Sequence, residues 1–224
     1  TMSLLLRGVG NAGAFVEQNV GDLLNLNAND LSVGSVTTWG PLTQGTAGSR
    51  PTCSAAVFGS SNGVTFDGGD YLRLAESIGA SGSIGSVLLA IKTPATFTKQ
   101  AVLSVADEAA ANKWFEIGVD TDGRLYIEYN NAGTIQTAKG STLLSVSTAY
   151  IVTVCFDGSD WYVEIDGVEE NPITLDSVGA FGWFGSVTGT LNCCVGATVT
   201  SGGATRFFSG SIGAVQLFST DISA

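Results

Sequence analysis

Apolar and polar residues alternate along most of the chain in short runs, which turn-forming residues separate at intervals of about 8–12 positions. A period of two puts successive side chains on opposite faces of a strand, so the pattern predicts half-buried β-strands rather than helices. The clearest strands are expected at Ser86–Lys92, Ala101–Ala106, Trp114–Asp120, Arg124–Tyr129, Ala149–Phe156, Trp161–Asp166, Cys193–Val199 and Phe207–Phe218. The pattern therefore predicts an all-β fold, an antiparallel β-sandwich.

Tight turns between these strands are marked by Asp-Gly pairs. Asp122-Gly123 and Asp166-Gly167 each stand between two alternating runs, and Asp-Gly supplies the positive φ that a two-residue hairpin needs. The first 22 residues do not follow the strand pattern, and we predict an N-terminal arm or an extra edge strand over residues 1–22. No proline-rich or charged linker divides residues 23–224, which we therefore expect to form one domain.

Composition excludes several classes of function. The chain contains no histidine, so a Ser-His-Asp triad, a Cys-His pair and a histidine zinc site are absent whatever the fold. Nine lysines and arginines against 20 acidic residues give a net charge of −11, which repels nucleic acid and anionic membranes. We expect neither as a partner.

The start of the chain and its cysteines bear on where the protein is made. Thr1 before Met2 reads as a cloning remnant, and the following residues lack the basic and apolar regions of a secretory signal. We therefore expect synthesis in a cytosol, where the four cysteines would stay reduced and buried. The vicinal pair Cys193-Cys194 would point to opposite faces of its strand.

Several segments, in the order in which they occur, resemble laminin-G-like, concanavalin A-like jelly-roll domains. The segments are Asn29–Leu31, Val36–Trp39, Gly63–Leu72, Phe115–Leu125, Val152–Asp157, Trp161–Gly167 and Phe208–Val215. The resemblance implies two curved sheets, one of them concave, with ligand-binding loops at a rim. It implies no particular activity, because such domains serve as lectins, adhesive modules, hydrolases and phage structural proteins.

Two groups of residues are candidates for contact with a sugar. Tyr126, Glu128 and Asn130 alternate onto one face of a predicted strand and would line the concave sheet. Phe181 and Trp183 stand between glycines outside any clear strand, where exposed rings would offer a stacking surface. The alternative for the aromatic residues is the core of the sandwich, where large rings usually pack.

A second constellation raises the question of catalysis. Glu164, Asp166 and Glu169 resemble the Glu-x-Asp-x-x-Glu signature of the retaining β-glucanases of this superfamily, in which two carboxylates flank the scissile bond. The alternative is that Asp166-Gly167 forms a hairpin turn, which would carry Glu169 onto the return strand. We favour the hairpin and expect no enzymatic activity.

Acidic pairs in predicted turns are candidates for calcium ligands. Asp67 with Asp70, and Asp120 with Asp122, supply the carboxylate oxygens that Ca²⁺ prefers. Such pairs more often form Asx turns, in which the carboxylate bonds to nearby backbone. We therefore expect no cofactor and no metal, with Ca²⁺ as the alternative.

Three functions are compatible with the sequence. The first is a non-enzymatic, lectin-like jelly-roll module of a phage virion, a capsid decoration or tail-associated protein that contacts host surface glycans. Its partners would be capsid or tail subunits, and a homo-oligomer is left open. The alternative is a carbohydrate-binding adhesin module that is secreted or sits on a bacterial surface. The third is a retaining glycoside hydrolase that uses Glu164 and Glu169.

Overall fold

The computed structural model describes residues 22–75, 83–170, 174–175 and 181–220, and nearly all regular structure in them is β-strand. The strands are β1 (Asp22–Asn27), β2 (Gly34–Ser35), β3 (Thr38–Trp39), β4 (Leu42–Thr43), β5 (Thr52–Phe58), β6 (Ser61–Thr65), β7 (Leu72–Leu74), β8 (Gly85–Lys92), β9 (Gln100–Asp107), β10 (Lys113–Val119), β11 (Leu125–Asn131), β12 (Thr134–Lys139), β13 (Ala149–Phe156), β14 (Trp161–Ile165), β15 (Val168–Glu169), β16 (Thr174–Leu175), β17 (Leu191–Val195), β18 (Thr198–Thr200), β19 (Gly203–Thr205) and β20 (Ser211–Phe218). Short 3-10 helices cover Ala28–Asp30, Ala47–Ser49 and Phe184–Ser186. Within these residues, no helix has the length and apolar character needed to cross a bilayer.

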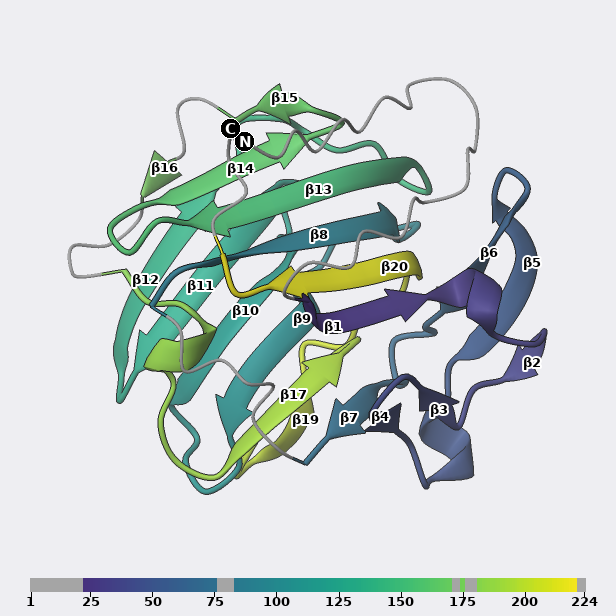
Figure 1. Ribbon diagram of the computed structural model, residues 1–224, viewed down its shortest axis with the longest axis horizontal. Helices are drawn as coiled ribbons and strands as arrows, with labels where there is room; N and C mark the ends of the chain where they lie inside the picture. The colour runs from purple at the N-terminus through teal and green to yellow at the C-terminus, as the bar shows by residue number, and fades with distance from the viewer. Residues whose placement is uncertain (1–21, 76–82, 171–173, 176–180, 221–224) are drawn as a thin grey trace.

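Two antiparallel sheets form the sandwich (Figure 1). Sheet A has the strand order β15-β14-β13-β8-β20-β6-β5-β2, and β1 pairs with β20 beside this path. Sheet B has the order β16-β12-β11-β10-β9-β17-β7-β4-β3. The pairing confirms the all-β, antiparallel sandwich expected from the alternating pattern.

Strand β20 occupies the middle of sheet A. It pairs with β8 between Ser211 and Phe218, with β6 through its first two residues, and with β1 from Ala214 to Phe218. Residues 1–21 of the expected arm lie outside the described residues, and the boundary expected after residue 22 stays a prediction. The described chain already forms a strand at Asp22.

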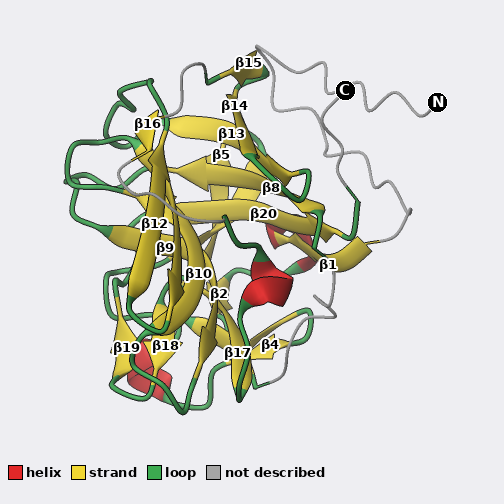
Figure 2. Cartoon of the chain, turned by 90° about the vertical axis from the view of Figure 1, so that its left-hand side faces the viewer, coloured by secondary structure: helices red, strands yellow, loops and turns green. Residues whose placement is uncertain are grey.

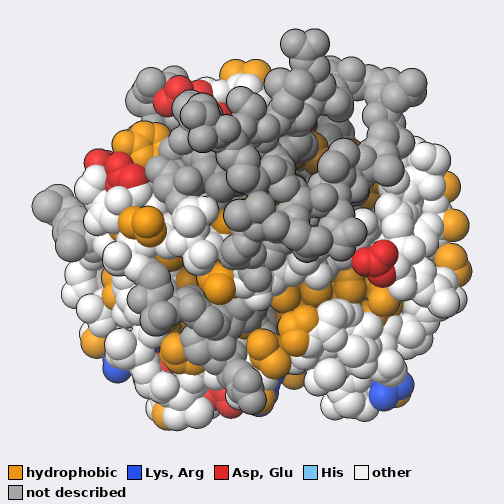
Figure 3. Space-filling view, viewed as in Figure 1, with side chains coloured by type: hydrophobic (Ala, Val, Ile, Leu, Met, Phe, Trp, Pro, Cys, Tyr) orange, Lys and Arg blue, Asp and Glu red, His pale blue; other side chains and the backbone are white. Residues whose placement is uncertain are grey.

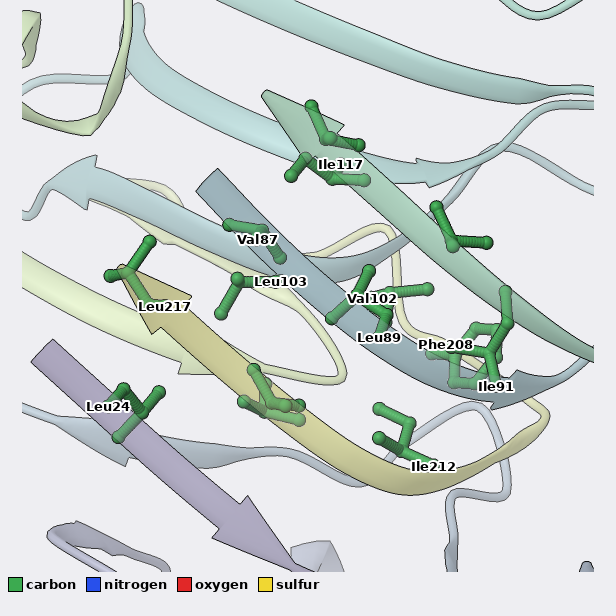
Figure 4. Packing of buried hydrophobic residues seen from close by; sticks show 14 of the residues in the cluster. Leu24, Val87, Leu89, Ile91, Val102, Leu103, Ile117, Phe208, Ile212 and Leu217 are labelled. Atoms are coloured by element: carbon green, nitrogen blue, oxygen red, sulfur yellow. The ribbon is translucent and has the colours of Figure 1, made fainter. Parts of the chain in front are cut away.

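The core lies between the two sheets and follows the period of two. On β10, Phe115, Ile117 and Val119 point into the core, whereas Glu116 between them does not belong to it. Side chains from β8, β9, β10 and β20 meet between the sheets, as the close view of Val87, Leu103 and Ile117 illustrates (Figure 4). Each sheet thus keeps one face apolar and leaves its other face for different chemistry.

Asp166 and Gly167 form the hairpin turn that the sequence predicts. Both residues have positive φ, 53° and 75°, and the strands on either side, β14 and β15, pair directly. Gly123 also has a positive φ, 75°, at the turn between β10 and β11. The Asp-Gly pairs therefore mark hairpins correctly.

One expected strand is in fact two. The run predicted over Cys193–Val199 breaks at Gly196, whose φ is +90° and where a Cβ atom would collide with the ring of Phe66. The chain leaves sheet B at this glycine, and β18 pairs with β19 as a separate hairpin. The strand expected over Phe207–Phe218 begins only at Ser211, and β12 was not predicted.

All four cysteines, Cys53, Cys155, Cys193 and Cys194, are free thiols and buried, as the sequence predicts. Cys193 lies in the core, and the thiol of Cys194 on the opposite face donates to Asn192 Oδ1 at 3.1 Å. Burial raises the pKa of both thiols of the vicinal pair. These cysteines are therefore structural side chains.

Candidate functional site

The face of sheet B that points away from sheet A, hereafter the outer face, carries buried polar side chains. Tyr126, Glu128 and Asn130 alternate along β11 on this face and are 0%, 2% and 3% exposed. Their shared face is the one that the sequence predicts. Glu116 and Trp114 on the neighbouring strand β10 join them, because β10 and β11 pair in register.

Four charged side chains meet on the outer face, and we refer to Lys99, Glu116, Glu128 and Arg206 as the charged cluster. Glu116 and Glu128 are direct cross-strand partners on β10 and β11. Nη1 of Arg206 bonds to Oε1 of both carboxylates, at 2.7 Å from Glu128. Nζ of Lys99 lies 2.5 Å from the other oxygen of Glu128. Two cations therefore offset two carboxylates that would otherwise repel each other.

Neutral donors complete the hydrogen bonding of the two carboxylates. The hydroxyl groups of Tyr126 and Thr198 donate to Glu116, at 2.7 Å and 2.6 Å. The indole N–H of Trp114 and the hydroxyl of Thr137 donate to Glu128, at 3.1 Å and 3.3 Å. A buried charge is tolerated only where such bonds replace its water.

The two carboxylates respond differently to their surroundings. Burial raises the pKa of Glu116 above its ordinary value, although the charge of Arg206 opposes the rise. Burial also acts to raise the pKa of Glu128, but the hydrogen bond from Lys99 and the charge of Arg206 outweigh it and lower that pKa. Tyr126 has a strongly raised pKa because it is buried beside Glu116. Its hydroxyl therefore stays a hydrogen-bond donor.

Each cation of the cluster also lies over an aromatic ring. The guanidinium of Arg206 is 4.9 Å from the ring centre of Trp114, and the ammonium of Lys99 is 4.8 Å from that of Tyr126. Both cationic side chains remain partly exposed, at 25% and 32%. A ligand on the outer face would therefore meet the two cations and the partly exposed Trp114, while the carboxylates lie beneath them.

The hairpin of β18 and β19 covers the part of the outer face beside the cluster. Asn192 Nδ2 donates to the carbonyl of Val199 at 2.8 Å, and Ser104 Oγ donates to that of Ala197 at 2.8 Å. Figure 2 places this hairpin at the lower left, on the far side of the molecule from β20 and β1. The hairpin also contacts β10, since the hydroxyl of Thr198 on β18 donates to Glu116.

The opposite side of the molecule, where sheet A lies in front, is chemically different. Among the described residues that Figure 3 draws, uncharged side chains and backbone predominate, and lysine and arginine lie near the lower margin. The ion pairs between described residues all join residues outside the strands of sheet A. The described part of sheet A therefore carries no comparable cluster of paired charges. The outer face of sheet B is therefore the candidate site.

The three candidate catalytic residues lie on sheet A. Glu169 falls on the return strand, as the hairpin interpretation predicts, but the pairing places it directly opposite Glu164. Asp166 lies in the turn, where its carboxylate accepts a hydrogen bond from the backbone N–H of Ile151 at 2.8 Å. Directly opposed residues share a face, so Glu164 and Glu169 stand side by side at an edge, next to Val168, which is 66% exposed. Glu164 is half-buried and Glu169 is exposed.

The candidate calcium ligands already have partners. Lys139 Nζ lies 2.7 Å from Asp120 and 3.6 Å from Asp122, so an ammonium group occupies the place a metal ion would take. Asp67 accepts from the backbone N–H of Gly69 at 2.8 Å, as in an Asx turn. Asp70 accepts from the N–H of Asp67 at 3.2 Å. No group of three or more potential metal ligands occurs in the described part of the chain.

Trp183 belongs to the core, which corrects the expectation of an exposed ring. It is 2% exposed, stacks on Phe156 with centroids 5.8 Å apart, and meets Phe115 edge-on at 5.2 Å. Phe181 is partly buried, 4.7 Å from the ring of Trp161. Trp183 therefore offers no stacking surface to a sugar. The glycines that flank it allow close packing, since a Cβ at Gly182 would meet a tyrosine ring in the core.

A family model described as the concanavalin A-like lectin/glucanases superfamily matches residues 66–224, which include the whole charged cluster. The chain belongs to this superfamily. The match confirms the resemblance seen in the sequence. No curated protein matches the chain.

Solved structures show the same superfamily fold. The CBM40 domain of the IT-sialidase from Ruminococcus gnavus, bound to α2,3-sialyllactose, has a TM-score of 0.62 and 21% identity, covering 72% of this chain and 91% of that one. Domain 4 of AbnA, a GH43 extracellular arabinanase from Geobacillus stearothermophilus, in complex with arabinotriose, has a TM-score of 0.62 and 15% identity, covering 91% and 94%. A leech intramolecular trans-sialidase matches at 0.58 with 16% identity, over 91% of this chain and 26% of that one.

Sequence reasoning identified Glu128 but missed the other three residues of the charged cluster, Lys99, Glu116 and Arg206. Glu116 was detectable in principle, because alternation along a strand places a residue between the apolar Phe115 and Ile117 on the opposite face. Arg206 carries no local signal, since it follows a short hairpin and is 90 residues from Glu116. Trp114 was placed on a strand but was not assigned to the site.

Proposed function

We propose that the chain is a non-catalytic carbohydrate-binding module and that a glycan binds to the outer face of sheet B. The observation that carries the proposal is that the charged cluster and Trp114 lie together on the outer face of sheet B. Hydrogen bonds hold its donors in place, and sugar recognition needs a few fixed polar groups beside an aromatic surface. Fixed donors lose little entropy when a ligand binds.

Similarity to two domains whose structures contain glycans supports this proposal. This chain covers more than nine tenths of the length of both the R. gnavus CBM40 domain and AbnA domain 4. The former is part of a sialidase and the latter of an extracellular arabinanase. Both favour the alternative from the sequence, a carbohydrate-binding module that is secreted or exposed on a surface. The role in a phage virion, with capsid or tail subunits as partners, stays a prediction.

We propose a non-catalytic module because the carboxylates of the charged cluster are not accessible to a substrate. Glu116 is 0% and Glu128 2% exposed, so neither carboxylate can reach a glycosidic bond on the surface. A retaining glycosidase needs both carboxylates in contact with its substrate. The cluster therefore supports binding rather than hydrolysis.

The proposal is tested by screening the full chain on a glycan array and measuring the dissociation constants of the hits by calorimetry. We expect at least one glycan to bind, and Trp114→Ala to weaken it tenfold or more. Tyr162→Ala is the matched control, because Tyr162 is an exposed aromatic residue on sheet A, and it should leave binding unchanged. An array without hits, or equal effects of the two variants, would overturn the proposal. If Trp114→Ala does not fold by circular dichroism, Trp114→Phe provides the same comparison.

A further inference from the structure

The geometry of the charged cluster points to uncharged glycans as the ligand class of the outer face, with discrimination against glycans that carry a carboxylate. This inference rests on the proposed function and adds the chemistry of the ligand. It also separates this chain from the CBM40 domain, whose structure contains a sialylated sugar.

Every lysine and arginine found on the described outer face already lies beside a carboxylate. Arg73 pairs with Glu108 at 2.9 Å, and Lys139 pairs with Asp120 at 2.7 Å. Lys99 and Arg206 pair with Glu128 at 2.5 Å and 2.7 Å. A ligand carboxylate would have to compete with these partners, which are part of the protein and cannot leave.

Lys99 and Arg206 each contact both a carboxylate and an aromatic ring. Arg206 bonds to two carboxylates through one nitrogen, and its guanidinium lies against Trp114. Lys99 lies between Glu128 and the ring of Tyr126. The formal charges of Lys99, Arg206 and their two glutamates sum to zero, so the cluster offers no net attraction to an anion.

A carboxylate brought to either cation would also come close to Glu128, which bonds to both of them. Like charges at that separation repel, and the partly buried position of the cluster reduces screening by salt. The net charge of −11 on the whole chain acts in the same direction. Anionic sugars are therefore disfavoured locally and at long range.

Neutral sugars face no such penalty. Among the described residues, Arg206 bonds to the carboxylates through Nη1, which leaves the N–H groups on Nε and Nη2 to donate to sugar hydroxyls. The partly exposed ring of Trp114 lies against the same guanidinium. Hydroxyl oxygens accept these bonds without bringing charge toward Glu128. Arabinotriose, found with AbnA domain 4, is a sugar of this uncharged kind.

The deciding experiment compares neutral, sialylated and uronic-acid glycans on one array, followed by calorimetry with lactose and 3′-sialyllactose. We expect the hits to be uncharged glycans, with any sialylated or uronic-acid counterpart at least tenfold weaker. Hits that require a carboxylate would overturn this inference and leave the proposed function standing. An array with no hits would overturn the proposed function itself.

A charge-changing variant gives a second measurement. Glu128→Gln leaves Lys99 and Arg206 in excess, so the affinity ratio of the carboxylate-bearing to the neutral glycan should rise threefold or more. Glu169→Gln is the matched control on sheet A and should leave the ratio unchanged. Glu116→Gln substitutes where Glu128→Gln does not fold, with the same expected direction. A ratio that stays constant in the folded variant contradicts the inference.

Discussion

Glu116 and Glu128 lie directly opposite each other on adjacent strands, and a single guanidinium nitrogen of Arg206 bonds to both carboxylates. Opposed like charges destabilise a pair of strands, and burial increases the cost. The arginine therefore sits at the one position from which it offsets both charges. The stability of the face depends on it.

Replacing Arg206 by methionine should lower the free energy of unfolding by about 3 kcal/mol, because it leaves two buried carboxylates with one remaining cation. Methionine keeps the apolar contact with Trp114. The control is Arg73→Met, which breaks an ion pair whose side chains are 34% and 26% exposed and should cost less than about 1 kcal/mol. Urea denaturation measures both, and equal losses would contradict the role given to Arg206.

The acid sensitivity of the protein should depend on Glu128. Its pKa is lowered in the folded state, so its stabilising contribution is complete above its ordinary pKa and is lost as the pH falls through the lowered value. Glu116, whose pKa is raised by burial, acts in the opposite direction and loses its contribution as the pH rises through the folded value. We expect the free energy of unfolding to fall less steeply below about pH 5 in Glu128→Gln than in the wild type. Parallel curves would contradict this assignment.

Glu164 and Glu169 should not support hydrolysis. They are cross-strand partners, but they stand at an exposed edge beside Val168. Purified protein should leave β-glucans uncut in a reducing-end assay. Cleavage that disappears in Glu164→Gln would reverse the conclusion, whereas cleavage that persists in this variant would indicate a contaminating enzyme.

The cysteines should react only after unfolding. All four are buried, and burial raises the pKa of Cys193 and Cys194, so the reactive thiolate is scarce in the folded protein. With a thiol-specific chromogenic reagent we expect almost no reaction under native conditions and four thiols in denaturant. Two or fewer thiols in denaturant would indicate disulfide bonds and contradict the four free thiols of the structure.

The fold could be predicted because alternation is a local property of the chain. Each long strand carries its own apolar face, and each Asp-Gly pair forms its own turn, as in Asp166-Gly167. Gly196 shows the limit of this reasoning. The strand breaks at this glycine because the ring of Phe66, from a distant segment, packs closely against its backbone. The alternation of apolar and polar residues carries no information about such a contact.

The site was harder to predict because its parts meet only after the sheet has formed. Tyr126, Glu128 and Asn130 could be assigned to one face from their spacing alone. The partner across the strand, Glu116, depends on the register between β10 and β11, and Arg206 is 78 residues from Glu128. Trp183 illustrates the opposite error, since local glycines suggested exposure where packing of the two sheets buries the ring.

The position of β20 has a consequence for folding order. This strand is the last one described, yet it pairs with β8, β6 and β1 in the middle of sheet A. Until residues 211–218 have been synthesised, those three strands present unpaired edges, which invite pairing with other chains. Because contacts so distant in sequence slow folding, sheet A should assemble only once β20 has been synthesised. Nascent or truncated chains that lack β20 should consequently aggregate, and the completed chain should fold without a stable N-terminal intermediate.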